Sequence, residues 1–239
     1  FGREADWEAI TGLDFLTETG GQTSPEDLGL IGQTNDAMAF LIKLDWQLGA
    51  DHLLTIRDNY STQKGENLTS SEPDIGLSNN GFEESRFNSL VATLNSVVAD
   101  RMVNEVSLQW AVEERPRSTN ISTTPEASID DHRATWGRNQ LLPSFLDEDR
   151  VQLTEDLSWT LGNHTLNVGA NLDLVTFDDG FFRYGGGSYS YNEWEGTEEG
   201  FLDGGVPTSY TQSFSTVDGT VRFTNNYYAV YLQDEWYAA

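Results

Sequence analysis

Apolar and polar residues alternate along three separate stretches of this chain, and in each stretch a very short turn joins two alternating runs. A period of two indicates a β-strand with one apolar face and one polar face. The stretches and their turns are residues 37–63 with Gly49-Ala50-Asp51, residues 90–112 with Asp100-Arg101, and residues 151–174 with Gly162-Asn163. The last turn is a Gly/Asn pair, which supplies the positive φ angles that a two-residue hairpin needs. We therefore predict three antiparallel hairpins.

Two further alternating runs flank the hairpins, residues 10–16 before them and residues 228–236 after them, which makes about eight strands. The turns inside the hairpins are short, whereas the segments between the hairpins are long and acidic. Strands of about ten residues rise roughly 33 Å and, at a tilt of about 45°, span roughly 23 Å, close to the apolar band of an outer-membrane barrel.

These features predict an all-β fold, namely an antiparallel up-and-down transmembrane β-barrel segment with short periplasmic turns and long extracellular loops. The same alternation also builds soluble sandwiches and barrels, in which the apolar face is a core. Three acidic residues share the apolar face: Asp58, Glu155 and, near a strand end, Asp234. Because a charge in hydrocarbon is costly, we expect Asp58 and Glu155 either to lie above the apolar band or to follow a bulge that shifts the register.

The composition narrows the class of protein. The 239 residues include no cysteine, which excludes disulfides, cysteine-ligated zinc and thiol chemistry. The 13 basic and 39 acidic residues give a net charge of −26, which argues against a nucleic-acid partner and favours cations, cationic ligands or simple solubility. No apolar run reaches about 18 residues, so no transmembrane helix is predicted. Since the chain starts at Phe1 without a signal peptide, we interpret residues 1–239 as one partial β-barrel domain of a larger protein.

The long segment 178–222 is rich in aromatic residues interleaved with glycines. Aromatic side chains on such a loop can bind a ligand by stacking and hydrogen bonding, and long loops without secondary structure are often functional. The predicted ligand-binding residues are Phe181, Phe182, Tyr184, Tyr189, Tyr191 and Trp194. The alternative is that these aromatics pack the loop against itself.

Residues with catalytic chemistry are scattered, and we predict that the protein is not an enzyme. The histidines His52, His132 and His164 are isolated and lack HExxH spacing. Gly185-Gly186-Gly187 lacks the lysine and the strand-to-helix context of a phosphate-binding loop, so we expect it to give loop flexibility. The acidic clusters are Asp147-Glu148-Asp149, Asp178-Asp179 and Glu198-Glu199. They lack EF-hand spacing, so we predict no catalytic residue, metal ligand or cofactor, with Ca²⁺ as the alternative.

Five short motifs follow one another along the chain. They are residues 43–48 (KLDWQL), 52–57 (HLLTIR), 104–105 (NE), 162–169 (GNHTLNVG) and 228–236 (YAVYLQDEW). In order and spacing they resemble the barrel of TonB-dependent outer-membrane receptors, and within that family the Oar-like branch. The resemblance covers nearly the whole chain. In the family these motifs are strand signatures at the periplasmic side, so they identify the architecture and transfer no binding site.

The resemblance implies a bacterial outer-membrane barrel of about 22 strands around a plug, with energy supplied through TonB. On this view the plug and the remaining strands lie outside the chain, the hairpin turns face the periplasm and the long loops face outward. The residues that then point into the lumen, toward the plug or the permeating solute, are Lys43, Asp45, Arg57, Asn167 and Asn171.

The predicted function is a receptor that captures a solute, such as a peptide or a glycan, with its acidic and aromatic extracellular loops and passes the solute through the lumen. The expected partners are this solute, the TonB system acting through the plug, and outer-membrane lipid. Two alternatives stay open: a secreted soluble β-rich module that binds a glycan or a calcium-bridged ligand, and a barrel that serves adhesion or protein export.

Overall fold

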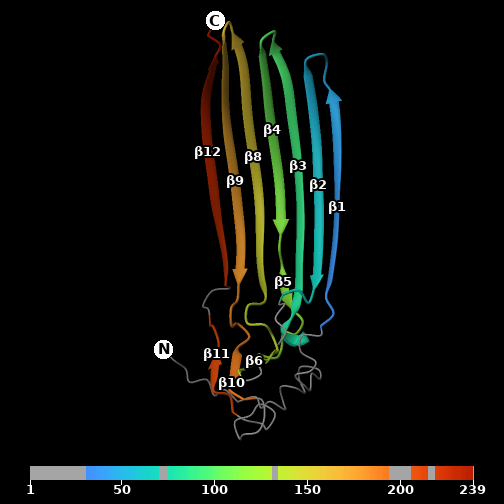
Figure 1. Ribbon diagram of the computed structural model, residues 1–239, viewed down its shortest axis with the longest axis vertical. Helices are drawn as coiled ribbons and strands as arrows, with labels where there is room; N and C mark the ends of the chain where they lie inside the picture. The colour runs from blue at the N-terminus through green and yellow to red at the C-terminus, as the bar shows by residue number, and fades with distance from the viewer. Residues whose placement is uncertain (1–30, 70–74, 131–133, 194–205, 215–218, 239) are drawn as a thin grey trace.

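The computed structural model describes residues 31–69, 75–130, 134–193, 206–214 and 219–238. Seven long antiparallel strands lie side by side in a main sheet (Figure 1). In spatial order they are β1 (Thr34–Gln47), β2 (His52–Glu66), β3 (Gly81–Ala99), β4 (Met102–Glu114), β8 (Ser144–Leu161), β9 (His164–Phe181) and β12 (Thr220–Trp236). The short strand β5 (Arg117–Thr119) also joins this sheet, by pairing with β3 and β8. No helix in the described part of the chain has the length and apolar character needed to cross a membrane.

The three predicted hairpins are confirmed as β1–β2, β3–β4 and β8–β9, and their short turns lie at one end of the main sheet (Figure 1). Between β8 and β9, Gly162 has φ +60°, a left-handed conformation that glycine adopts at little steric cost. The predicted last strand is confirmed as β12, whereas the run 10–16 lies outside the described residues. The long segments leave from the opposite end of the sheet, as the pattern of turns and loops predicts.

The seven long strands of the main sheet have 13 to 19 residues and are therefore longer than predicted. Only part of each strand is apolar on one face; in β8 this part is residues 151–161, which rise about 33 Å. Beyond the apolar part the same face carries charges, such as Asp178 directly opposite Arg222. The backbone ladder continues there because strand pairing does not require apolar side chains. The apolar run thus predicts the apolar part of a strand and misses its polar extension.

The side chains of the main sheet divide into an apolar face and a polar face, because residues paired directly across two strands share a face. On the apolar face, Leu108 of β4 lies beside Leu153 of β8. On the polar face, Ser107 lies beside Thr154. Although β4 and β8 are central strands, Leu108 remains 50% exposed. No element in the described part of the chain covers the apolar face.

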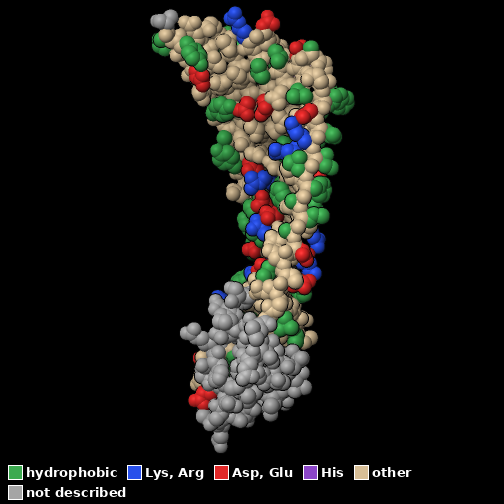
Figure 2. Space-filling view, turned by 45° about the vertical axis from the view of Figure 1, so that its right-hand side comes forward, with side chains coloured by type: hydrophobic (Ala, Val, Ile, Leu, Met, Phe, Trp, Pro, Cys, Tyr) green, Lys and Arg blue, Asp and Glu red, His purple; other side chains and the backbone are tan. Residues whose placement is uncertain are grey.

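The polar face is more crowded than the apolar face. Small side chains on it, such as Ser89 and Ala111, are only 3% and 6% exposed. Longer side chains shield them: Gln109 donates a 2.8 Å hydrogen bond to Ser89, and Arg150 lies directly across from Ala111. Figure 2 shows basic and acidic side chains interleaved in a stripe along the sheet. Crowding on one face and exposure on the other indicate a sheet that curves toward its polar side, as the wall of a barrel does.

The expectation that Asp58 and Glu155 lie above the apolar band or follow a bulge is wrong. Their directly paired neighbours are Ile42 and Leu90 for Asp58, and Val106 and Ala170 for Glu155. Within the described main sheet the only register shift lies between Val97 and Ala99. Asn88 donates a 3.0 Å hydrogen bond to Asp58. Glu155 lines a groove of about 400 Å³ on the apolar face. Both carboxylates therefore lie among apolar rows.

A second, smaller sheet lies at the long-loop end of the main sheet (Figure 1). We call this sheet, together with the short helix η2, the cap. Its elements are η2 (Leu77–Asn79), β6 (Glu126–Ile129), β7 (Ala134–Trp136), β10 (Ser188–Tyr191) and β11 (Ser209–Thr211). They come from three loops, which join β2 to β3, β4 to β8 and β9 to β12. A buried core fills the cap, formed by Ala127, Ile129, Ala134, Trp136, Tyr189 and Tyr191.

Candidate functional site

The predicted loop aromatics separate into an accessible group and a buried group. Phe181, the last residue of β9, is 53% exposed, and Phe182 and Tyr184 are half-buried. The guanidinium carbon of Arg183 lies 4.9 Å from the centroid of the Tyr184 ring, which is a cation–π contact. Trp194 lies outside the described residues. The accessible surface at the predicted ligand site therefore comes from Phe181, Phe182 and Tyr184.

Tyr189 and Tyr191 belong to the core of the cap, where they are 5% and 1% exposed. The rings of Tyr189 and Tyr210 lie 4.5 Å apart, centroid to centroid. Burial raises the pKa of Tyr189 and of Tyr191, because the charged phenolate would be poorly solvated in this core. These two rings pack the loop against itself, as the alternative prediction describes, and they present almost no surface to a ligand.

A buried carboxylate that the sequence predictions missed links the three loops of the cap. Glu126 is 3% exposed. It accepts hydrogen bonds from Asn79 Nδ2 at 2.9 Å, the backbone N–H of Gln140 at 2.9 Å and Ser188 Oγ at 3.0 Å. The three donors come from three different loops, and together they compensate the loss of water around the buried charge. The cap loops are therefore one packed unit, and no local sequence pattern around Glu126 indicates this role.

The triple glycine has a packing role that the prediction of loop flexibility missed. Gly187 has φ +82°, and a Cβ atom there would lie 2.5 Å from Tyr210 Oη. A Cβ atom on Gly186 would lie 2.7 Å from Arg138 Cδ. Glycine is needed where the backbone takes a positive φ and approaches another side chain closely. The glycines thus let β10 join the cap sheet beside β11.

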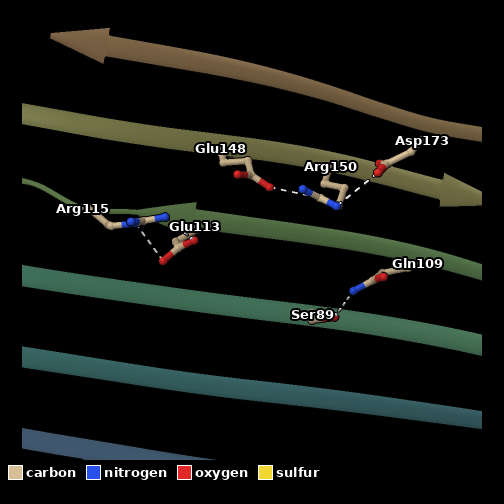
Figure 3. A network of polar contacts seen from close by, with 7 residues as sticks. All are labelled: Ser89, Gln109, Glu113, Arg115, Glu148, Arg150 and Asp173. Atoms are coloured by element: carbon tan, nitrogen blue, oxygen red, sulfur yellow. Dashed lines mark hydrogen bonds and ion pairs between the residues drawn. The ribbon is translucent and has the colours of Figure 1, made fainter. Parts of the chain in front are cut away.

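Basic and acidic side chains form a network along the polar face of the main sheet, which Figure 3 shows from close by. Arg150 on β8 bridges two carboxylates, with Nε 3.0 Å from Glu148 Oε1 and Nη1 3.1 Å from Asp173 Oδ2. Nearer the cap, Arg115 Nε lies 2.8 Å from Glu113 Oε1. Charges that are paired in this way suit a face in contact with water.

All five residues predicted to face the lumen lie on this polar face, as the strand register shows. They are Lys43, Asp45, Arg57, Asn167 and Asn171. Lys43 Nζ lies 3.0 Å from Asp45 Oδ2, which also accepts a 2.6 Å hydrogen bond at Oδ1 from Thr55. Asn167 lines a polar groove of about 410 Å³ near the short-turn end of the sheet. That these residues contact a plug or a solute stays a prediction.

The strand geometry separates the acidic side chains within each described cluster, whereas His132 and the cluster Glu198-Glu199 lie outside the described residues. In Asp147-Glu148-Asp149 the middle side chain points to the polar face and the outer two to the opposite face, because the cluster lies within β8. Among the described residues, no three or more histidine, aspartate or glutamate side chains are grouped to hold a metal ion. At the short-turn end, His164 Nδ1 lies 2.8 Å from Asp234 Oδ2, which gives this acidic residue of the apolar face a partner.

Comparisons with known proteins agree with this architecture. A family model described as "Outer membrane beta barrel domain" matches residues 22–239. The solved structure of the outer membrane transporter YddB from Escherichia coli is similar, with a TM-score of 0.56 and 13% sequence identity. The match covers 85% of this chain and 26% of YddB, so the chain spans about a quarter of the length of that transporter. The comparison with curated proteins gave no match.

Proposed function

Because the chain belongs to the family of outer membrane β-barrel domains and is a protein of the bacterial outer membrane, we propose that it forms part of the barrel of a TonB-dependent receptor of the Oar-like branch. In this proposal the cap faces outward and captures a solute. The solute then crosses along the polar face of the main sheet when TonB acts on a plug. The proposal includes no catalytic step, metal or cofactor.

The observation that carries the proposal is the two-faced main sheet with a cap at one end. Its apolar face, exposed even on central strands, suits contact with lipid. Its polar face, with paired charges such as Arg150 and Asp173, suits a water-filled path. The fold of a known outer membrane transporter supports this arrangement. A soluble secreted module is disfavoured because nothing described covers the apolar face.

The cap offers the first contact for the solute. Phe181, Phe182 and Tyr184 keep accessible surface next to Arg183 at the mouth of the sheet. Because Glu126 ties three loops together, these aromatics sit on a rigid support, which reduces the entropy lost when a ligand binds. Stacking and hydrogen bonding at such a site suit peptides and glycans.

Dependence on TonB can be tested without knowing the solute. The chain has no cysteine, so Asn171→Cys introduces a single thiol on the polar face. We expect a membrane-impermeant maleimide to label this thiol faster in cells with TonB than in cells lacking it, because TonB would move the plug that shields the lumen. Ser209→Cys in the exposed part of the cap is the control and should label equally in both strains. Equal labelling of Asn171→Cys in both strains would contradict TonB dependence.

A further inference from the structure

One basic side chain on the polar face, Arg57, differs from all the others that the structure describes there. Its four counterparts each have a carboxylate within ion-pair distance: Lys43 with Asp45, Arg115 with Glu113, Arg117 with Glu83, and Arg150 with Glu148 and Asp173. Among the described residues the side chain of Arg57 has no ion pair or hydrogen bond, although acids outnumber bases 39 to 13 in the chain. The lack of a partner at Arg57 is therefore not explained by a shortage of carboxylates.

The strand register explains why no neighbour in the sheet neutralises Arg57. It lies on β2, which is flanked on both sides by described strands, with Lys43 directly opposite on β1 and Val91 directly opposite on β3. Like charges directly across two strands destabilise a sheet. The acid next to this pair on the polar face, Asp45, is already engaged by Lys43 and by Thr55. A partner for Arg57 therefore has to approach from above the polar face, that is, from inside the barrel.

We propose that Arg57 and Lys43 form a binding position for a carboxylate group inside the lumen. That this position faces the lumen rests on the proposed function. The guanidinium of Arg57 binds the carboxylate by two parallel hydrogen bonds. The ammonium of Lys43, which lies directly opposite, donates a further hydrogen bond to this carboxylate while Lys43 stays paired with Asp45. Two kinds of molecule could supply this carboxylate group. It belongs either to an acidic side chain of a segment of the protein that lies in the lumen, or to an acidic solute during passage.

The side chains around Arg57 and Lys43 favour the binding of a negatively charged group. Both basic side chains are exposed on the polar face, so a ligand reaches them without rearrangement of the sheet. The neighbouring polar groups on the same face are neutral on β2 (Thr55 and Asn59) and on β3 (Ser89 and Thr93). The one acid beside them, Asp45 on β1, is paired with Lys43. A negatively charged group is thus attracted here, whereas carboxylates dominate the polar groove around Glu105, Asp156 and Glu235 nearer the short turns.

The test measures how fast phenylglyoxal modifies each arginine of the complete receptor in its membrane, resolved by mass spectrometry. Arg101, which lies in an exposed turn and whose side chain has no partner among the described residues, is the internal control. Citrate serves as the carboxylate probe. Barrel formation is followed independently by the faster gel migration of the unheated protein, so that failure of this inference is distinguishable from failure of the proposed function.

Two results would support the proposal and would distinguish the sources. If the carboxylate belongs to the protein, Arg57 reacts about tenfold more slowly than Arg101 without citrate, as expected for a charge-assisted pair. In that case a carbodiimide joins the amine of the Arg57→Lys variant to an aspartate or glutamate. If the carboxylate belongs to a solute, Arg57 reacts as fast as Arg101, citrate slows Arg57 alone, and Lys43→Gln weakens this protection.

Two other results would overturn the proposal. Arg57 would react as fast as Arg101 with and without citrate if it were only solvated. Slow reaction of Arg57 with neither a carbodiimide cross-link nor a citrate effect would mean restricted access to the reagent, which is equally incompatible with a carboxylate position.

Discussion

The main sheet and the cap both consist of β-strands, yet the two regions bury opposite kinds of side chain. In the main sheet the large apolar residues lie outside, with Leu108 and Trp110 each 50% exposed, and small polar residues such as Ser89 are buried. In the cap, Trp136 and Ile129 are completely buried. The difference follows from the solvent that each region meets, since lipid accepts apolar side chains and water does not.

The carboxylates that lie among apolar side chains also differ between the two regions: Glu126 in the cap is buried, whereas Asp58 and Glu155 in the main sheet are half-buried. In the cap, Glu126 has three hydrogen-bond donors around its carboxylate. In the main sheet, the carboxylate of Asp58 has one donor, Asn88, and the side chain of Glu155 has no hydrogen bond or ion pair among the described residues. A carboxylate that folding removes from water needs compensating donors. The hydrogen bonds in the cap therefore satisfy its buried carboxylate, as in the core of a water-soluble protein. The carboxylates on the apolar face of the main sheet have fewer donors.

The largest expected effect contrasts two tryptophans. Trp136→Ala should destabilise the cap by about 3–5 kcal/mol, because it leaves a cavity in a closed core. Trp110→Ala on the apolar face should cost clearly less, because lipid chains can fill the space. Hydrogen exchange in lipid vesicles would report the two regions separately, with exchange in β6 and β10 accelerated only by Trp136→Ala. A greater loss from Trp110→Ala would mean that the apolar face is packed against protein.

A matched pair on β8 gives the next largest effect. Leu153→Arg places a charge on the apolar face, which should cost about 2–4 kcal/mol near the middle of a membrane. Thr154→Arg, one residue further on, places the same charge on the polar face and should be nearly neutral. Urea titration of the receptor in lipid vesicles measures both. Equal destabilisation by the two substitutions would show that the faces do not meet different solvents.

A smaller effect is expected for Glu126→Gln. The substitution keeps the size of the side chain but replaces one acceptor oxygen with an NH₂ group that faces a donor, so it should cost about 1–3 kcal/mol. Limited proteolysis would detect it as faster cleavage within the cap loops, with the main sheet unaffected. The control is Glu66→Gln, whose side chain forms an exposed ion pair with Lys64. Cleavage at the wild-type rate in Glu66→Gln and Glu126→Gln alike would show that Glu126 does not link the loops.

Sequence reasoning predicted the main sheet well because its signals are local. The turn at Gly162-Asn163 and the alternation around it specify β8 and β9 without reference to distant residues. The strand ends were missed because the strands continue past the apolar part, where charged pairs such as Arg222 and Asp178 take over.

The cap could not be predicted in the same way because its signals are distant in the sequence. Its strands have three or four residues each, and β10 pairs with β6 through Ser188 and Glu126, which are 62 residues apart. The one local clue is the alternation of serine and tyrosine in residues 188–191, which indicates a strand rather than a free loop. That clue would have placed Tyr189 and Tyr191 in a sheet instead of among the ligand-binding candidates.

The central claim is that the two faces of the main sheet meet different solvents, and cysteine scanning of residues 151–161 in β8 tests it most directly. The chain has no cysteine of its own, so each substitution gives one reporter thiol in this domain. A water-soluble maleimide should label positions 152, 154, 156, 158 and 160 and leave the intervening, lipid-facing positions unreacted. Labelling without a period of two, or with the opposite phase, would contradict the account.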